Sequence, residues 1–258
     1  MTLVPARPAA HHLIFPALTH PALRHGVFTR AGGVSPPPWQ SLNAGFHVGD
    51  SQANVLENRD RIKQALGLER LVSLQQVHGA TVRIVTDRPA GDVELAAADA
   101  LLTDLAGVGL MIQQADCQAV LLFDPARPAV GIAHAGWRGS VVNIIAASVH
   151  AMQENYGSRP DDLLAAVSPG LGPCCAEFRN FRHELPAGLH AYQVAPNHFD
   201  FWAVSRDQLL AAGLQPARIT IAGRCTVCDR RFFSYRRDRL CGRSASVIGL
   251  RDNVHSAG

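Results

Sequence analysis

Three short segments of the sequence each carry a side chain that binds transition metals. These segments are Gln75-Gln76-Val77-His78-Gly79, Ala115-Asp116-Cys117 and His134-Ala135-Gly136-Trp137-Arg138-Gly139. Zinc accepts imidazole nitrogen and thiolate sulfur in tetrahedral geometry, and three protein ligands leave a fourth position for water or substrate. His78, Cys117 and His134 are therefore candidate ligands of a catalytic zinc ion, which would lower the pKa of a bound water and act as a Lewis acid.

The spacing of these three residues matches no compact zinc-finger pattern, so other roles for them stay open. Asp116 is next to Cys117. Its carboxylate could accept a hydrogen bond from a metal-binding side chain, act as a general base, or cap the backbone. A further alternative needs no metal: Cys117 would be a nucleophile and His134 or His78 its base. The same side chains serve both chemistries, and the sequence does not separate them.

Each candidate ligand lies at or near the end of an expected strand. His78 precedes Gly79, Cys117 precedes the apolar run 118–123, and His134 follows the run 129–133. Strand ends along one sheet edge are where a fold gathers side chains that are distant in sequence. Further apolar runs predict strands at 81–85, 99–103, 108–112, 163–167, 218–222 and 246–250.

Apolar residues at helical spacing predict helices at 50–66, 140–156 and 200–212, each followed by a glycine, with Asp50 as the cap of the first. The expected strands outnumber the helices and follow one another directly between 99 and 134. That order excludes an alternating βα barrel and favours an α+β fold with mixed sheets flanked by helices. We expect a single domain over 1–258, with residues 1–20 as a peripheral N-terminal extension.

Composition indicates a globular protein. Of the 258 residues, 47% are hydrophobic and 17% charged, so the chain can bury a sizeable core. No apolar stretch reaches the ~20 residues that cross a bilayer, and residues 1–15 lack the apolar segment of a secretory signal. The six cysteines are too few for a disulfide scaffold. We therefore expect a cytoplasmic protein with reduced thiols that does not bind a membrane.

The net charge of +3 is mild, but arginines concentrate near the C-terminal end of the sequence. They could form a solvated face with structural ion pairs, bind a small anion such as phosphate, or bind nucleic acid. No recognised nucleic-acid motif accompanies them, so we expect no nucleic-acid partner. These arginines are Arg224, Arg230, Arg231, Arg236, Arg237, Arg239 and Arg243, with Asp229 and Asp238 among them.

A set of motifs resembles the YfiH-like family, which is also described as laccase-domain, multicopper polyphenol oxidoreductase or purine nucleoside phosphorylase. The similarity extends in order from about residue 25 to residue 250, and the hexamer His134–Gly139 is highly specific. The chain departs from the common pattern at Gln114, Gln118 and Ala176, but it retains all three proposed ligands. The other matching motifs are Phe28–Ser35, Ser41-Leu42-Asn43, Val48-Gly49-Asp50, Glu57-Asn58-Arg59, Val77-His78-Gly79, Ala115-Asp116-Cys117, Gly172-Pro173-Cys174-Cys175, Cys225–Asp229 and Arg231–Arg237.

The resemblance implies a zinc site at His78, Cys117 and His134, and a fold of roughly four layers in the order α/β/β/α. It also implies phosphorolysis of adenosine, inosine, guanosine and methylthioadenosine, with adenosine deamination as a second activity. The partners would be a purine nucleoside and phosphate. We expect the chain to be a monomer or a weak dimer.

Two other activities follow from the same resemblance. One is copper-dependent phenol oxidation by a laccase, which needs several coppers held by paired histidine motifs. Among the 12 histidines only His11 and His12 are adjacent, and no His-x-His pattern occurs. The other is a Cys-His hydrolase that acts on cell-wall precursor peptides.

Several polar residues are candidates for substrate binding. Asn43, Arg59, Gln76 and Arg138 could hold ribose or phosphate, since the forked donors of arginine suit phosphate oxygens. Alternatively, Arg59 and Arg138 pair with nearby acids and fix loops. His47 is either a pocket residue or a structural histidine.

The remaining cysteines are expected to be structural. Adjacent Cys174 and Cys175 do not easily chelate one ion together, so we predict that they pack in the core. Cys225-Thr226-Val227-Cys228 resembles half of a zinc site or a redox pair, but the sequence offers no recognisable second half.

Overall fold

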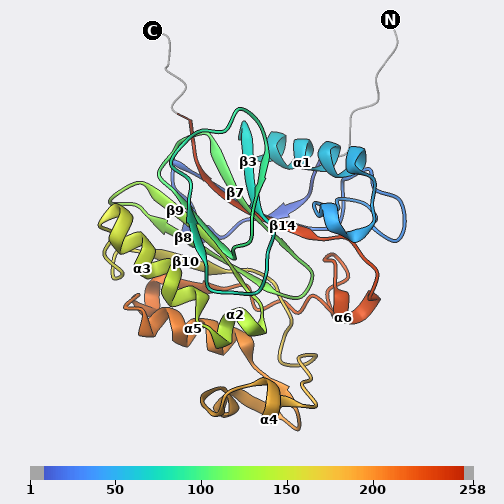
Figure 1. Ribbon diagram of the computed structural model, residues 1–258, viewed down its shortest axis with the longest axis vertical. Coiled ribbons are helices and arrows are strands. Elements are labelled where there is room, and N and C mark those ends of the chain that lie inside the picture. The colour runs from blue at the N-terminus through green and yellow to red at the C-terminus, as the bar shows by residue number, and fades with distance from the viewer. Residues whose placement is uncertain (1–8, 253–258) are drawn as a thin grey trace, which may run out of the picture.

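The computed structural model describes residues 9–252 as two six-stranded sheets that pack face to face (Figure 1). Helix α1 covers the outer face of the first sheet, and helices α3 and α5 cover the outer face of the second. The predicted α+β class, a single domain with mixed sheets flanked by helices in four layers, is confirmed.

The first sheet has the strand order β1-β2-β14-β7-β3-β5. Its pairs are antiparallel from β1 to β7 and parallel from β7 to β5, so the sheet is mixed. The strands span His12–Leu13 (β1), Leu23–Phe28 (β2), Arg70–Leu74 (β3), Val93–Leu95 (β5), Val108–Gln114 (β7) and Ser244–Leu250 (β14).

The second sheet has the order β13-β10-β8-β9-β6-β4, with parallel pairs at both edges and antiparallel pairs inside. A separate hairpin joins β11 (Gln193–Ala195) to β12 (His198–Phe199). The strands of the second sheet span Val82–Ile84 (β4), Ala100–Thr103 (β6), Gln118–Asp124 (β8), Ala129–Ala135 (β9), Leu164–Val167 (β10) and Ile219–Ile221 (β13).

Alternate residues of the inner strands belong to two different hydrophobic layers, because successive side chains of a strand point to opposite faces. In β8, Leu121 and Phe123 face the layer between the sheets, whereas Val120 and Leu122 face α3 and α5. Strand β9 alternates in the same way. Burial on both faces explains why these strands are continuous apolar runs in the sequence.

The helices are short, and within the described residues none combines the length and apolar character needed to cross a bilayer. The cap of α1 is Ser51, whose hydroxyl accepts a hydrogen bond from Asn54 N, so the predicted cap at Asp50 is wrong by one residue. Asp50 instead accepts a bond from the backbone of Ser51. The α-helices span Gln52–Leu66 (α1), Trp137–Val141 (α2), Ile144–Tyr156 (α3), Phe181–Glu184 (α4), Phe201–Ala211 (α5) and Tyr235–Asp238 (α6), and the 3-10 turns span Pro16–Leu18, Phe46–Val48, Ala187–Tyr192 and Pro216–Arg218.

The expected helix at 140–156 is two helices, α2 and α3. Asn143 lies between them in the left-handed region, at φ 56°, and its side chain accepts a hydrogen bond from Ala146 N. Asparagine tolerates this conformation and caps helices well, so it ends one helix and starts the next. Periodicity of the apolar residues alone does not detect such a break.

Four strands of the first sheet, β1, β2, β3 and β5, were not expected from the sequence. Strand β2 contains Arg24, His25 and Gly26, and β3 begins with Arg70, so neither is an uninterrupted apolar run.

The prediction that residues 1–20 are a peripheral extension is wrong for residues 12–18. Strand β1 pairs with β2, and Phe15 and Leu18 are buried in the core between the sheets; residues 1–8 lie outside the described range.

Residues around α4 form a lobe that projects from the two sheets at the bottom of Figure 1. The lobe has its own apolar cluster, in which Phe178 packs against Phe199 and Phe201. We call this region, residues 176–201, the α4 lobe. It lies at the edge of the cavity described below, which Phe178 and Phe201 line.

His25 connects the N-terminal segment to the first sheet. Its Nε2 accepts a hydrogen bond of 2.8 Å from Phe15 N, which requires that this nitrogen carry no proton. Burial and the neighbouring His12 lower the pKa of His25 from 6.5 to about 4. The folded state therefore holds His25 neutral.

We predict that acid destabilises the fold through His25. Because the unfolded chain binds the proton near pH 6.5 and the folded chain near pH 4, the stability supplied by neutral His25 is lost as pH falls through this window. The loss is as much as about 3 kcal/mol. His25→Gln keeps an acceptor but cannot titrate, so its urea midpoint should change less between pH 7 and pH 4.5 than that of the unsubstituted protein. His183→Gln, at an exposed position, is the control; equal pH profiles for all three proteins would contradict the assignment.

Candidate metal centre and active-site cavity

The structure brings His78, Cys117 and His134 together. One potential ligand atom from each residue lies within 4.8 Å of the others, so the group could hold a metal ion. The two imidazole rings have centroids 4.8 Å apart and stand edge to face. The three residues come from three different parts of the chain, and the convergence predicted from the sequence is present.

Strand alternation explains why Cys117 and His134 meet. Strands β8 and β9 pair antiparallel, with Ala119 opposite His134. His134 lies on the same face of β9 as Ile132, and Cys117 continues the face of β8 that carries Leu121; both faces look into the layer between the sheets. The two ligands therefore close this layer at one end, next to its apolar side chains.

The buried carboxylate of Asp99 orients both histidines. Its Oδ1 accepts hydrogen bonds from His134 Nδ1 at 2.8 Å and from His78 N at 2.9 Å, and its Oδ2 accepts one from Gly79 N at 2.6 Å. His78 lies in a turn after β3 with φ 63°, and Asp99 holds this turn in place. Because Nδ1 of His134 donates to Asp99, the other nitrogen, Nε2, is left for an ion.

Charge interactions prepare the Cys117 sulfur to bind a cation. Burial alone would raise the pKa of the Cys117 thiol, but the charge and hydrogen bonds of His134 and then of His78 lower it to about 6. Burial opposes protonation of His134, yet the Cys117 thiolate and Asp99 raise its pKa to about 9. In the absence of an ion, thiolate and imidazolium stabilise each other.

Gly136 leaves the space that the cluster needs. A Cβ at this position would lie 2.9 Å from Cys117 Sγ and 3.2 Å from His78 Cδ2. Any larger residue would therefore push into the ligands. The glycine also starts the turn from β9 into α2, so the same residue ends the strand that carries His134.

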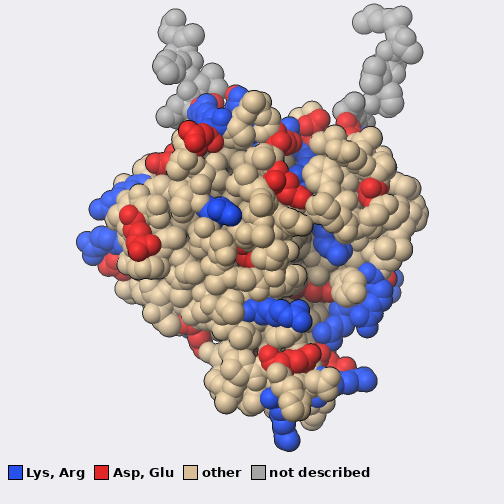
Figure 2. Space-filling view, viewed as in Figure 1, with Lys and Arg blue, Asp and Glu red and all other residues tan. Residues whose placement is uncertain are grey.

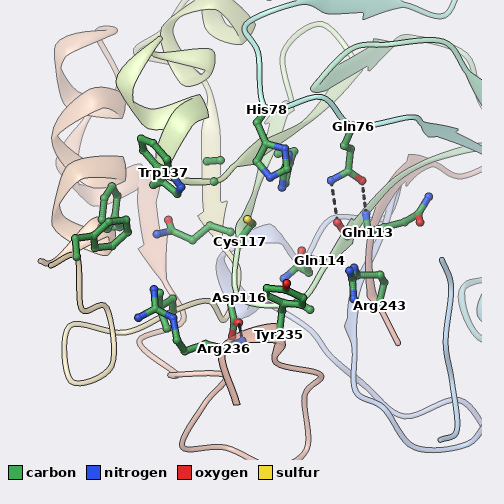
Figure 3. A pocket seen from close by; sticks show the side chains of 18 of the residues that line it. Gln76, His78, Gln113, Gln114, Asp116, Cys117, Trp137, Tyr235, Arg236 and Arg243 are labelled. Carbon is green, nitrogen blue, oxygen red and sulfur yellow. Dashed lines mark hydrogen bonds between the residues drawn. The ribbon is translucent and has the colours of Figure 1, made fainter. Parts of the chain in front are cut away.

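The cluster lies in a cavity of about 790 Å³. In Figure 3 the Cys117 sulfur points towards the His78 ring, while Tyr235, Arg236 and Arg243 lie further along the same cavity. The cavity is large enough for a small-molecule ligand, since such sites commonly enclose 300–1,000 Å³. Its lining includes Gln76, Gln113, Asp116, Trp137, Phe178, Arg179, Phe201, Arg239 and His47 in addition to the residues just named.

Asp116 lines the cavity, but its carboxylate oxygens are bonded to residues other than the three candidate metal ligands. Its carboxylate accepts hydrogen bonds from Thr226 Oγ1 at 2.7 Å and from Arg236 N at 2.6 Å. Asp99 is the residue that accepts a hydrogen bond from a candidate metal ligand, His134, and the sequence did not indicate it. Asp116 instead connects the segment of Cys117 to the C-terminal segment that forms the opposite part of the wall.

The five predicted substrate contacts divide into two groups. His47 and Gln76 line the cavity, although the Gln76 side chain already bonds to both backbone groups of Gln113 (Figure 3). Asn43, Arg59 and Arg138 are not among the lining residues. Their placement gives no support to direct contact with ribose or phosphate.

These three residues act on the cavity through their neighbours. Arg59 is buried and bonds to Glu94, which also accepts bonds from His47 and Gln113 in the wall. The side chain of Asn43 accepts a bond from Arg243 N. The exposed Arg138 stacks on Trp137, with its guanidinium carbon 4.3 Å from the ring centroid.

The basic C-terminal segment serves two purposes. Arg231 pairs with Asp229 as a solvated ion pair of little energetic weight. The mostly buried Arg237 pairs with Asp238 and also donates to the backbone oxygens of Thr226, Val227 and Phe232, so it fixes the local backbone. Arg236, Arg239 and Arg243 line the cavity instead. Basic side chains gather around α6, beside the α4 lobe, in Figure 2. Arginine and aromatic residues are grouped together between Arg230 and Arg237, and this grouping was the available signal for the lining residues.

A second cysteine cluster was not expected from the sequence. Cys174, Cys175, Cys225 and Cys228 place their sulfurs within 4.8 Å of one another, and this group also could hold a metal ion. The prediction that Cys174 and Cys175 pack in the core is wrong, because Cys174 is exposed and Cys175 half-buried. These two residues supply the second half that Cys225 and Cys228 lacked in the sequence.

Comparison with known proteins gives consistent results. A family model described as multi-copper polyphenol oxidoreductase laccase matches residues 24–251. Purine nucleoside phosphorylase YlmD of Geobacillus stearothermophilus is 39% identical over 246 residues, or 88% of this chain and 90% of that protein. Purine nucleoside phosphorylase YfiH of Escherichia coli is 36% identical over 231 residues, or 86% of this chain and 91% of that protein. The crystal structure of YlmD from G. stearothermophilus matches with a TM-score of 0.82 at 37% identity, covering 92% of this chain and 94% of that one.

Two facing mixed sheets with a His-Cys-His cluster in a deep cavity define an α+β enzyme with a candidate metal centre. The chain belongs to the multi-copper polyphenol oxidoreductase laccase family, whose members include the YfiH-like proteins. The expected family membership is confirmed.

We predict that Asp99→Asn weakens metal binding without unfolding the protein. An NH₂ group in place of Oδ1 would face the N–H groups of both the His134 ring and His78, and in place of Oδ2 it would face Gly79 N–H. Either orientation therefore loses bonds that hold the ligands in place. Loss of such an outer partner typically raises the metal dissociation constant 10–100-fold. Competition with a chromogenic chelator measures this constant, and circular dichroism monitors folding. The control is Asp104→Asn, an exposed carboxylate just after β6; an unchanged dissociation constant in Asp99→Asn would refute the role.

Proposed function

We propose that the protein is a zinc-dependent purine nucleoside phosphorylase. Its substrates would be adenosine, inosine, guanosine and methylthioadenosine, and it would also deaminate adenosine. The observation that carries the proposal is a three-ligand metal cluster in a cavity that also contains arginine side chains. The named activity of relatives that are 36–39% identical supports the choice of nucleoside and phosphate as substrates.

Zinc suits the cluster because two imidazole nitrogens and one thiolate are ligands it prefers, and a fourth position stays open. Zinc bound there would supply Lewis-acid chemistry. The role of the chain is to keep the ligands fixed: Asp99 orients His134, and Gly136 leaves room beside Cys117. Free thiols at all six cysteines suit a reducing cytoplasm as the site of action.

The arginines of the cavity provide donors for phosphate. Arg236, Arg239 and Arg243 present guanidinium groups, whose fork matches phosphate oxygens. Arg243 also donates to the backbone oxygens of Cys241 and Gly242, and this fixes the position of its side chain. A phosphate held at this wall would lie in the same cavity as the metal cluster.

Aromatic side chains provide surfaces for a purine ring. Trp137 and Phe178 are edge to face, with centroids 6.1 Å apart, and both line the cavity together with Tyr235. Flat rings of this kind stack on a nucleobase and bind many bases alike. Tolerance of adenine, guanine and hypoxanthine would follow from stacking rather than from base-specific hydrogen bonds.

Phosphorolysis in this cavity would exchange one bond for another at the sugar. A phosphate oxygen forms a bond to C1′ of ribose as the bond from C1′ to the base nitrogen breaks. The base leaves with the bonding electron pair, and the proton of hydrogen phosphate ends on the base. The chain contributes by holding phosphate and nucleoside in reach of each other and by excluding water from the sugar.

A second candidate function rests on a different feature of the same residues. Cys117, His134 and Asp99 form a chain of thiol, imidazole and carboxylate, the arrangement that activates a nucleophile in cysteine hydrolases. Such an enzyme would act on an amide or ester, as in the hydrolysis of cell-wall precursor peptides, and would need no metal. Its activity would persist after exhaustive chelation, whereas nucleoside phosphorolysis would be lost.

We predict phosphate-dependent release of hypoxanthine from inosine by the zinc-loaded protein. Base release should fall to background without phosphate or after chelation, and it should return when zinc is restored. Adenosine without phosphate should yield inosine by deamination. Chromatography of the products measures both reactions. No base release with zinc fully bound would reject the proposal, and stoichiometric copper with oxygen consumption on a phenol would favour an oxidase.

We predict that removing a cavity arginine affects phosphate more than nucleoside. Arg239→Met and Arg243→Met should each raise KM for phosphate by about tenfold or more, because each removes a charge-assisted contact worth roughly 1.5–3 kcal/mol. KM for inosine should change less than threefold. Arg206→Met on α5, which is exposed outside the cavity, is the matched control. If phosphate KM stays unchanged in both variants, phosphate binds elsewhere.

A further inference from the structure

The second cysteine cluster has the dimensions of a metal site. Cys228 Sγ lies 3.7 Å from Cys174 Sγ and 3.6 Å from Cys175 Sγ, and all four sulfurs lie within 4.8 Å of one another. Four thiolates around zinc at about 2.3 Å in tetrahedral geometry have neighbouring sulfurs roughly 3.8 Å apart. The observed separations are therefore close to those of a tetrahedral ion site.

A disulfide fits this geometry less well. A disulfide joins one pair of sulfurs at about 2.05 Å and leaves the others apart. Here Cys228 is nearly equidistant from two sulfurs, which belong to adjacent residues, and all four thiols are free. Similar distances between the sulfurs are expected when all of them surround one ion. A disulfide between two of the cysteines would instead make one distance much shorter than the others.

Gly172 leaves the space that lets the two cysteine segments approach each other. A Cβ at this position would lie 2.9 Å from the Cys225 Cβ and 2.8 Å from the Trp202 ring. A larger residue would therefore push Cys225 away from the segment that carries Cys174 and Cys175.

We propose that Cys174, Cys175, Cys225 and Cys228 bind a second metal ion, a structural Zn²⁺ with four thiolate ligands. Four protein ligands close the coordination sphere, so this ion has no position for substrate, unlike an ion at His78, Cys117 and His134. Soft thiolates select zinc over magnesium, calcium or manganese.

The second ion would fix the wall of the cavity. Thr226 N donates to Gly170 O at 3.0 Å, so the two cysteine segments run side by side before they reach the cluster. Phe178 and Arg179 follow Cys175 in the sequence, and Tyr235 and Arg236 follow Cys228; all four line the cavity. Tying the two segments together holds these side chains at a fixed separation.

The second site is also connected to the first cluster. Asp116, next to Cys117, accepts a hydrogen bond from Thr226, which is next to Cys225. Arg236 donates to Glu177 O at 2.9 Å and through its backbone to Asp116. Loss of the second ion would therefore displace the arginines of the cavity wall near Arg236 before it displaces the ligands His78, Cys117 and His134.

The test counts ions and does not depend on activity. Protein purified with reductant and a weak chelator should contain two zinc ions per chain by mass spectrometry of the metal. Cys174→Ser and Cys228→Ser should each contain one, Cys117→Ser should contain one, and Cys117→Ser combined with Cys228→Ser should contain none. Cys241→Ala is the matched control, because this buried thiol belongs to neither cluster, and it should keep two.

A second measurement does not require a variant of the second site. Cobalt added to metal-free Cys117→Ser protein should bind one equivalent and give the intense thiolate-to-cobalt absorption of a four-sulfur site. Its removal by a strong chelator should lower the melting temperature by about 5 °C or more. One ion in the unsubstituted protein, lost in Cys117→Ser, or a disulfide at Cys228 found by intact mass under denaturing conditions, would overturn the proposal.

Discussion

The buried carboxylate of Asp99 is the constraint on which the metal-binding cluster depends. It accepts hydrogen bonds from the His134 ring and from the backbone N–H groups of His78 and Gly79. A charged group with no exposure is tolerated only where donors surround it, and Asp99 has them from two segments. One residue therefore fixes the ring of one ligand and the backbone of another. Cys117 needs no such support, because the pairing of β8 with β9 positions it directly.

The cavity is assembled from parts of the chain that are far apart in sequence. The ends of β8 and β9 provide Cys117 and His134, and the turn after β3 provides His78. The α4 lobe provides Phe178 and Phe201, and the C-terminal segment provides the arginines. Asp116 links the first and third of these parts, and the cysteine cluster links the second and third. The rigid sheets thus position the metal cluster, whereas loops held by a few polar contacts form the remainder of the wall.

The sequence predicted the strands whose two faces are both buried, and it predicted the candidate metal ligands, whose side chains bind transition metals. Strands such as β8 and β9 were found because they are continuous apolar runs, and His78, Cys117 and His134 because of residue type and family motifs. Asp99 was missed because a single aspartate at the start of an apolar run resembles a turn residue. The four-cysteine cluster was missed because its two halves meet only through packing of the segment at Gly170 against Cys225, which no spacing rule describes. The break at Asn143 depends on a left-handed backbone conformation that apolar periodicity does not report.

Strand β9 has a consequence for how such a protein can change over evolution. Its odd-numbered positions pack under α3 and α5, while Val130, Ile132 and His134 face between the sheets. Substitutions on either face can be absorbed one at a time by neighbouring side chains. An insertion or deletion of one residue within the strand would instead exchange the two faces, turning the imidazole towards the helices and an alanine towards Cys117. The length of this strand should therefore be far less free to vary than its composition.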